Sequence, residues 1–490
     1  MPSRPSTLKD LKNSGWARRS VREEIRTNLI AALRDGRTLF PGIVGYDDTV
    51  IPQIVNALLA GHDLILIGLR GQAKTRILRS LTAFLDPEIP ILAGAPLNDD
   101  PFAPASTEGR RLIAEQGDAA KIKWWPREAR YQEKLATPDV SMADLMGDID
   151  PIRAAARGES ILDDEAVAYG ILPRTNRGIF AVNELPDLAP RIQVALLNVM
   201  EERDIQIRGF PIRIPLDILL VFSANPEDYT RRGNLITPLR DRIAAQIHTH
   251  YPRTLEDGMA VTAQESWVER EGFKIQVPHL ARELVEEVAR SARQSDWVDQ
   301  TSGVSARLTI ALMETVISNA ERRALASGHA DTCVRLSDFF AATSAISGKV
   351  ELVFEGEREG PERVATHLVG QAAKAVFDRR FPDFFAQDEN DSPYGPIADY
   401  FRDGGETITD DRETDARLFA TLIDLPGLQE LLDAYLVELE EGAEILGAEI
   451  VLEGLHQHSV LSKDQSSGQS AYTDMVAGMW EDIDGKGPVR

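Results

Sequence analysis

The sequence predicts an α/β protein with a parallel sheet between two layers of helices, followed by further helical segments. From about Ile43 to Pro252, short runs of β-branched residues alternate with helical apolar patterns. This alternation is typical of a three-layer αβα domain built on a parallel sheet. From about Leu255 onward the apolar periodicity is helical, with almost no strand signal. We therefore expect one α/β domain and, after it, an α-helical part.

These patterns divide the 490 residues into five segments. We expect an N-terminal helical arm at 1–39, the α/β domain at 40–252, a small helical domain at 253–350, an acidic helical region at 351–461 and a flexible tail at 462–490. The tail is assigned from its content of Ser, Gly and Asp. Within the α/β domain, period-2 alternation around Gly209 predicts a hairpin at about 205–214.

Composition sets the broad class of the protein. With 43% hydrophobic and 27% charged residues, the chain is ordinary for a folded soluble protein. Its one cysteine, Cys333, excludes an intramolecular disulfide and a cysteine-based zinc site. No apolar stretch approaches the roughly 18 residues of a membrane span, and no apolar run follows the basic N-terminus. We expect a cytoplasmic protein without a membrane segment.

The charge is unevenly distributed. The formal net charge is −24, and about −20 of it lies beyond residue 350. Attraction to nucleic acid needs a basic surface. We therefore do not expect DNA or RNA as a partner of the whole molecule.

A glycine-rich loop lies between the apolar run Leu64 to Ile67 and the helical pattern Arg76 to Leu85. The loop consists of Gly68, Leu69, Arg70, Gly71, Gln72, Ala73, Lys74 and Thr75. Glycines allow backbone N–H groups to converge on phosphate oxygens at a helix N-terminus, the lysine adds positive charge and the threonine offers a hydroxyl to Mg²⁺. These residues predict a phosphate-binding loop. An ordinary strand-to-helix turn with an exposed lysine is the structural alternative.

Two later strands end in polar residues suited to the same chemistry. The run from Gly178 ends in Asn183 and Glu184, and the run from Ile218 to Ser223 is followed by Asn225. Strand tips beside a phosphate loop hold the groups that position Mg²⁺ and the attacking water. We expect Glu184 to orient water, Asn183 to support Mg²⁺ together with Thr75, and Asn225 to sense the γ-phosphate. The structural alternatives are a buried strand that simply ends in polar residues and an ordinary Asn-Pro turn.

Two arginines further along are candidates for closing the site. Arg242 follows the run Pro238-Leu239-Arg240-Asp241, and Arg307 opens a helical pattern after Gly303-Val304-Ser305-Ala306. A guanidinium offered to the transferring phosphoryl group stabilises its charge. A solvated basic turn and a simple helix-start residue are the alternatives for these two positions.

The order of these elements over about residues 40 to 350 resembles the AAA+ ATPases, in the MoxR and magnesium-chelatase ATPase-subunit branch that carries an insert in helix 2. Gly68 to Thr75 spells the G-x-x-G-x-A-K-T loop common in MoxR-type proteins, so Ala73 fits the family. The segments Met146 to Asp150 and Tyr169 to Gly178 look like the chelatase subunit's approach to its second strand. The resemblance implies an insert at about 130–164, an arginine finger at Arg242 and a lid arginine at Arg307.

The resemblance implies a ring-forming ATPase, with ATP and Mg²⁺ as cofactors, that remodels or activates a partner protein as a chaperone does. A hexamer is the expected ring, and a separately encoded von Willebrand A domain protein is the partner common in this branch. Asn183 replaces the Asp of the family's D-E pair, which makes slow hydrolysis an open outcome. Two alternatives remain: a magnesium or cobalt chelatase ATPase subunit for tetrapyrrole metallation, and a nucleotide-gated scaffold with little hydrolysis.

Overall fold

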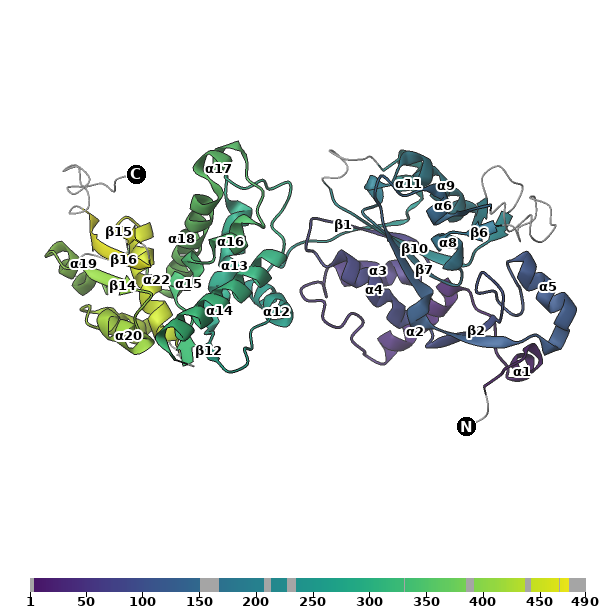
Figure 1. Cartoon of the computed structure of the whole chain (residues 1–490), viewed down its shortest axis with the longest axis horizontal. Coiled ribbons are helices and arrows are strands. Elements are labelled where there is room, and N and C mark those ends of the chain that lie inside the picture. Colours follow the sequence, from purple (N-terminus) through teal and green to yellow (C-terminus); the bar gives the residue numbers. More distant parts are fainter. Residues whose placement is uncertain are drawn as a thin grey trace. The chain divides into compact units, whose positions relative to one another are not determined.

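The computed structural model describes residues 4–149, 167–206, 213–226, 235–329, 331–384, 392–436, 442–466 and 468–475. The chain divides into two compact units, Met1–His250 and Tyr251–Arg490 (Figure 1). The candidate loop and the three strand tips belong to the first unit. The helical pattern that follows Leu255 belongs to the second.

A five-stranded parallel sheet forms the centre of the first unit, with the strand order β11-β1-β10-β7-β4. Its strands are β1 (Leu64–Ile67), β4 (Tyr131–Leu135), β7 (Gly178–Asn183), β10 (Ile218–Ala224) and β11 (Ala245–His248). Strands β1, β7 and β10 are buried along their whole length, as the central strands of a parallel sheet are. Because all strands run the same way, their carboxyl ends lie together at one edge.

Helices cover both faces of this sheet (Figure 1). On one face, α2 (Val21–Arg34), α3 (Val50–Leu59) and α4 (Lys74–Ser80) share a core with alternate residues of the central strands. On the other face, the core is formed with α6 (Met142–Leu145), α8 (Ile171–Arg174), α9 (Pro190–Glu202) and α11 (Thr237–Arg242). The prediction of a three-layer αβα domain on a parallel sheet is confirmed.

The N-terminal segment contributes to these layers. After α1 (Leu8–Asn13), a capping box formed by Ser20 and Glu23 starts α2. The Arg130 guanidinium, which has no exposed surface, donates to both carboxylate oxygens of Glu24 on α2, at 2.7 and 2.6 Å. A buried bidentate ion pair therefore joins α2 to the segment that leads into β4.

The structure differs from the expected insert at about 130–164, because residues 131–135 form β4, the edge strand paired with β7. Before β4, β2 (Glu88–Leu92) and β3 (Ile122–Pro126) pair antiparallel, with α5 (Thr107–Gln116) between them. After α6, β5 (Gly147–Ile149) pairs with β6 (Val167–Tyr169). Residues 150–164 of the expected insert lie outside the described residues.

A short antiparallel pair occurs where the sequence predicts a hairpin. It consists of β8 (Asp204–Gln206) and β9 (Arg213–Pro215), with Ile205 opposite Ile214. The residues between them, 207–212, lie outside the described part of the chain.

The second unit is mainly helical. Its helices are α12 (Leu255–Glu265), α13 (His279–Gln294), α14 (Arg307–Ser327), α15 (Leu336–Phe340), α16 (Thr343–Ser347), α17 (Phe354–Glu359), α18 (Pro361–Arg380), α19 (Gly395–Arg402), α20 (Asp415–Ile423), α21 (Leu428–Tyr435) and α22 (Ala443–Gln457). A short parallel pair joins β12 (Lys274–Gln276) to β13 (Asp331–Cys333). The helices expected for the 253–350 and 351–461 segments contribute to one continuous core, in which Cys333 is buried.

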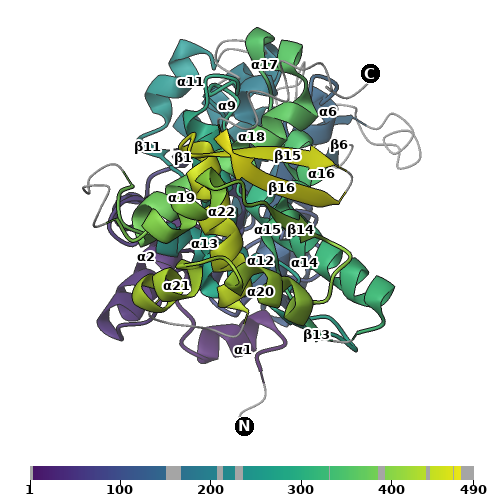
Figure 2. The same cartoon turned by 90° about the vertical axis from the view of Figure 1, so that its left-hand side faces the viewer.

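An antiparallel sheet of three strands, in the order β14-β16-β15, completes the second unit (Figure 2). The strands are β14 (Thr407–Asp410), β15 (Leu461–Ser466) and β16 (Gln469–Asp474). The structure therefore differs from the expected tail at 462–490 in its first part, since residues up to 474 pair within a sheet. None of the described helices combines the length and the apolar character that a membrane span requires.

Candidate functional site

The loop after β1 has the backbone geometry of a tight turn into a helix. Gly71 has φ +74° and Ala73, the residue before α4, has φ +54°, so both adopt the left-handed conformation. The side chains of Thr249 and Gln72 lie close to Gly68, and a Cβ there would lie 1.9 Å from Thr249 Oγ1. Gly68 therefore excludes a side chain at the point where the loop leaves the strand.

A hydrogen-bonded network lies behind the loop and fixes its course. Thr249, after β11, donates from Oγ1 to Oε1 of the buried Gln72 at 2.6 Å. The Tyr46 hydroxyl is 3.1 Å from the carbonyl oxygen of Gln72 and 2.7 Å from that of His250. Burial raises the pKa of Tyr46 to about 12, so the phenol stays protonated as a donor. Sequence reasoning missed Tyr46 and Thr249, which lie far from the loop in sequence.

Lys74 opens α4 and its side chain is 7% exposed. Its ammonium donates to the carbonyl oxygens of Gly68 and Leu69, the latter at 2.9 Å, and to Asn225 Oδ1 at 2.7 Å. These three acceptors are neutral oxygens. These are ligands that a more strongly charged phosphate oxygen can replace.

Asn183 receives two hydroxyl donors at the tip of β7. Thr75 Oγ1 lies 3.4 Å and Ser223 Oγ lies 3.1 Å from Asn183 Oδ1. Asn183 is 8% exposed and Ser223 is 1% exposed. The structure therefore brings Thr75 and Asn183, the two residues expected to support Mg²⁺, within hydrogen-bonding distance of each other.

Glu184 follows directly, at the point where β7 ends. Its φ of +56° places it in the left-handed region, and its backbone N–H donates to Ser223 Oγ at 3.3 Å. Ser223 therefore contacts both residues of the tip, Asn183 through its hydroxyl proton and Glu184 through its oxygen. Sequence reasoning missed Ser223; its signal is a hydroxyl residue inside an otherwise apolar strand, one position before the strand ends.

The two arginines lie in different units. Arg242 ends α11 and pairs with Glu201 at 2.5 Å, with its side chain about one third exposed. Arg307 opens α14 in the second unit and is exposed. The structure thus brings together Lys74, Thr75, Asn183, Glu184 and Asn225. Arg242 is not part of that group of contacts, and Arg307 belongs to the second unit.

The residues present fit a nucleotide phosphate with Mg²⁺. Position 68 has no room for a side chain, and Lys74 supplies a positive charge near the loop backbone. The first N–H groups of a helix such as α4 have no partner within the helix. Thr75 and Asn183 offer the neutral oxygens that Mg²⁺ accepts, and Glu184 is the adjacent carboxylate. Phosphoryl transfer needs this combination of positioning and charge.

Comparisons with known proteins agree with this geometry. No family model matches the chain. The magnesium-chelatase subunit ChlI of Nostoc sp. is 32% identical over 225 residues, which cover 44% of this chain and 55% of that protein. The chloroplastic ChlI subunit of Glycine max is 27% identical over 319 residues, which cover 61% of this chain and 71% of that protein. The chain thus spans about half the length of the Nostoc relative.

Among solved structures, a complex between subunits BchI and BchD of magnesium chelatase matches with 23% identity and a TM-score of 0.35, covering 65% of this chain and 98% of that one. The sequence relatives and the site at the edge of the parallel sheet lead to the same family. Over the matched residues the chain is similar to magnesium-chelatase ATPase subunits, as the order of its sequence motifs implies.

Proposed function

We propose that this protein binds ATP with Mg²⁺ at the loop Gly68 to Thr75, hydrolyses it, and uses the cycle to remodel or activate a partner protein. One observation carries the proposal: Lys74, Thr75, Asn183, Glu184 and Asn225 converge at the carboxyl ends of three adjacent strands. A loop that only turned from strand to helix would not need the other strand tips to supply these groups.

Each side chain has a role that follows from its chemistry. The loop N–H groups and the Lys74 ammonium bind phosphate oxygens. Thr75 and Asn183 would hold Mg²⁺, which would supply positive charge to neutralise the phosphates. Glu184 orients the attacking water, and Asn225 exchanges its hydrogen bond with Lys74 for contacts to the γ-phosphate and that water.

We extend the proposal to assembly and location. Arg242 and Arg307 would act as the arginine finger and the lid arginine once subunits form a ring, with a hexamer as the expected size. Arg242 is partly exposed and held by a surface pair with Glu201, which is a weak interaction that a phosphate can replace. We place the ring in the cytoplasm, and we infer that a separately encoded von Willebrand A domain protein is the partner.

Asn183 favours a second candidate function. An amide supports Mg²⁺ without charge, and the Asn183 oxygen already accepts from Thr75 and Ser223. A site with this composition binds nucleotide and turns it over slowly, which suits a nucleotide-gated scaffold. The relatives are named as magnesium-chelatase subunits, so a chelatase role in tetrapyrrole metallation is the remaining candidate.

Steady-state phosphate release separates the ATPase from the scaffold. We expect the purified protein to release phosphate faster than Lys74→Ala, and Asn183→Asp to be faster still. Lys123→Ala, an exposed lysine on β3, is the matched control and keeps the wild-type rate. If the wild type binds ATP yet releases phosphate no faster than Lys74→Ala, the ATPase proposal fails and the scaffold remains.

Two further experiments test ring assembly and chelatase function. We expect mass photometry to show a ring in ATP that disassembles for Lys74→Ala. Chelatase function requires that porphyrin metallation in an extract supplemented with companion subunits depends on this chain. If the extract metallates porphyrin equally well without this protein, the chelatase proposal fails and the proposal of a remodelling ATPase remains.

A further inference from the structure

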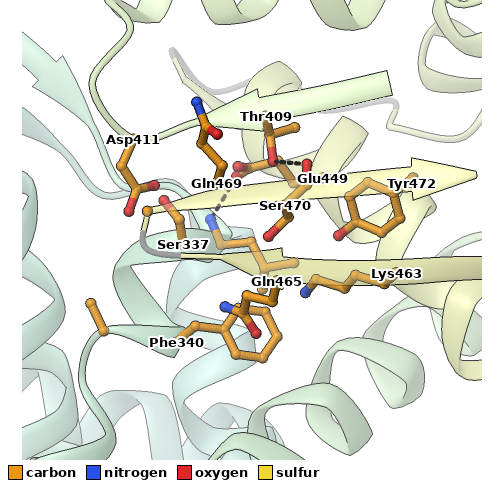
Figure 3. Close-up of a pocket in the computed structure, with 13 residues that line it drawn as sticks. Ser337, Phe340, Thr409, Asp411, Glu449, Lys463, Gln465, Gln469, Ser470 and Tyr472 are labelled. Carbon is orange, nitrogen blue, oxygen red and sulfur yellow. Dashed lines mark hydrogen bonds between the residues drawn. The ribbon is translucent and has the colours of Figure 1, made fainter. Parts of the chain in front are cut away.

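A cavity of about 170 Å³ lies in the second unit, between α15 and the sheet of β14, β16 and β15 (Figure 3). It is separate from the phosphate loop, which belongs to the first unit. Its wall is mostly polar, with the side chains of Ser337, Asp411, Glu449 and Gln465 around the space and Phe340 at one side. A volume of this size holds one small molecule or one long side chain of a partner.

Most other buried carboxylates in this unit have cationic partners; Glu286 is an exception, and its Oε1 accepts from the Thr262 hydroxyl. Arg379 and Arg380 pair with Glu283, Arg323 pairs with Asp338 at 2.9 Å, and Lys463 pairs with Glu453 at 2.8 Å. Such compensation is the rule, because an isolated buried charge is costly.

Glu449 also departs from this rule, and it differs from Glu286 in lining the cavity. It is 5% exposed and lines the cavity, and its Oε2 accepts from the backbone N–H of Leu336 at 2.6 Å. Within the described residues, no lysine or arginine forms an ion pair with it. Burial raises the pKa of Glu449 to about 7, although Arg335 and Arg323 act in the opposite direction. Arg335 and Arg323 thus act on the Glu449 carboxyl group without forming an ion pair with it, and its place in the cavity wall is open to a further cation.

The cavity wall contains two further polar side chains, Asp411 and Ser337. Asp411 is half-buried and, in the part of the chain that the structure describes, forms no ion pair. Ser337 Oγ is shielded from solvent and forms no hydrogen bond with any described group. Figure 3 shows the Ser337 hydroxyl and the Asp411 carboxylate on the same side of the space. These oxygens are acceptors for N–H donors.

The lysine in the wall does not supply the missing charge. Lys463 directs its ammonium to Glu453 at 2.8 Å and over the Phe340 ring at 4.0 Å from the centroid. Its charge is thus already compensated by a buried carboxylate. The cavity keeps an excess of negative charge, within a C-terminal part that carries about −20 of the formal charge.

We propose that this cavity binds an organic cation, a guanidinium or ammonium group on an aliphatic stem the size of an arginine side chain. A guanidinium offers five N–H donors in one plane, which suits two carboxylates and a hydroxyl spread around the space. The ligand is either a free cation or the side chain of a partner polypeptide. A metal ion is disfavoured, since no group of three or more metal-ligating side chains gathers among the described residues.

Calorimetric titration of the full chain tests the proposal. We expect L-arginine and N-acetyl-L-arginine amide to bind, L-lysine to bind more weakly, and acetate and Mg²⁺ not to bind at this cavity. Tighter binding of the blocked arginine identifies a polypeptide side chain as the source, and tighter binding of free arginine identifies a small molecule. Asp411→Asn is expected to weaken arginine binding at least tenfold, and Ser337→Ala to weaken it severalfold.

Asp424→Asn, an exposed acid on the end of α20, is the control and leaves the affinity unchanged. Circular dichroism establishes that each variant is folded, and Ser337→Ala serves where Asp411→Asn does not fold. The proposal is overturned if arginine does not bind at millimolar concentration, if neither wall variant weakens binding more than Asp424→Asn, or if acetate competes as well as arginine. None of these outcomes bears on the ATPase proposal, whose phosphate loop and strand tips lie in the first unit.

Discussion

Lys74 and Asn225 are 151 residues apart in sequence, yet the lysine ammonium lies 2.7 Å from the Asn225 amide oxygen. The sheet explains the contact. Strands β1 and β10 are neighbours, and Ile67 is in register with Ala224, so the residues that follow the two strands emerge side by side. The same ammonium contacts the Gly68 and Leu69 carbonyls. We expect a phosphate bound at the loop to compete for that ammonium and to release the Asn225 amide.

The first prediction concerns Asn225→Ala. We expect the kcat of ATP hydrolysis to fall about tenfold or more, with a KM change of less than about threefold, since Lys74 and the loop amides still bind phosphate. Phosphate release at varied ATP concentration measures both constants. Asn198→Ala, at an exposed position of α9, is the control. An Asn225→Ala protein with the wild-type kcat would remove Asn225 from the proposed mechanism.

The second prediction concerns Ser223, which positions the tip of β7. Ser223→Ala leaves Asn183 and the Glu184 N–H without one partner each in a buried site. We expect a loss of about 1–3 kcal/mol in the free energy of unfolding, together with a lower kcat at nearly constant KM. Urea unfolding and steady-state kinetics measure the two effects. Ser80→Ala removes a hydroxyl that donates to the carbonyl of Arg76 in its own helix, and we expect it to change neither.

The central strands of the sheet could be predicted from the sequence because they are short, mainly apolar runs that end at a glycine-rich loop or at polar residues. Leu64–Ile67, Gly178–Asn183 and Ile218–Ala224 each show this pattern. Parallel pairing then brings their carboxyl ends to one edge, so the contacts of Lys74 and Thr75 with Asn225 and Asn183 follow from chain order.

Polar strands could not be predicted in this way. Tyr131–Leu135 has no apolar run and is a strand because β7 offers it an edge, so its sequence reads equally well as part of an insert. Leu461–Ser466 and Gln469–Asp474 have the composition of a tail, and they form a sheet through pairing with β14. In each case tertiary pairing overrides local composition.

The cavity was also beyond sequence reasoning, for a different reason. Its wall combines Ser337, Asp411 and Glu449, which come from three separate parts of the second unit. None of the three belongs to a motif. Only the comparison of Glu449 with the paired carboxylates around it indicates a missing cation.

The third prediction concerns the buried ion pair of Glu24 and Arg130. Glu24→Gln leaves the fully buried Arg130 guanidinium without a counter-charge, and we expect the protein to lose about 3–5 kcal/mol of stability. Guanidinium chloride unfolding of the full chain measures the loss. Glu108→Gln breaks a surface pair with Arg111 and should cost less than about 1 kcal/mol. Equal losses in the two variants would show that burial does not set the strength of the Glu24 pair.

The fourth prediction concerns the pH dependence of stability that Glu449 gives to the second unit. Its pKa rises from the ordinary value of 4.5 to about 7 on folding, because burial disfavours the charged form. The folded state therefore binds a proton more tightly than the unfolded state between these values. Stability that is present below pH 4.5 is lost as the pH rises through 7, by roughly 3 kcal/mol in total.

Glu449→Gln removes that proton equilibrium. We expect the variant to exceed the wild type in free energy of unfolding by less than about 1 kcal/mol at pH 5 and by up to about 3 kcal/mol at pH 8. Urea unfolding followed by tryptophan fluorescence measures the difference. Glu453→Gln is the contrasting control: the Lys463 ion pair lowers the pKa of Glu453 against the effect of burial, so this variant loses stability at pH 8. If Glu449→Gln is equally or less stable than the wild type at pH 8, the carboxylate already has a positive partner in the folded chain, and the cation proposed for the cavity is not needed.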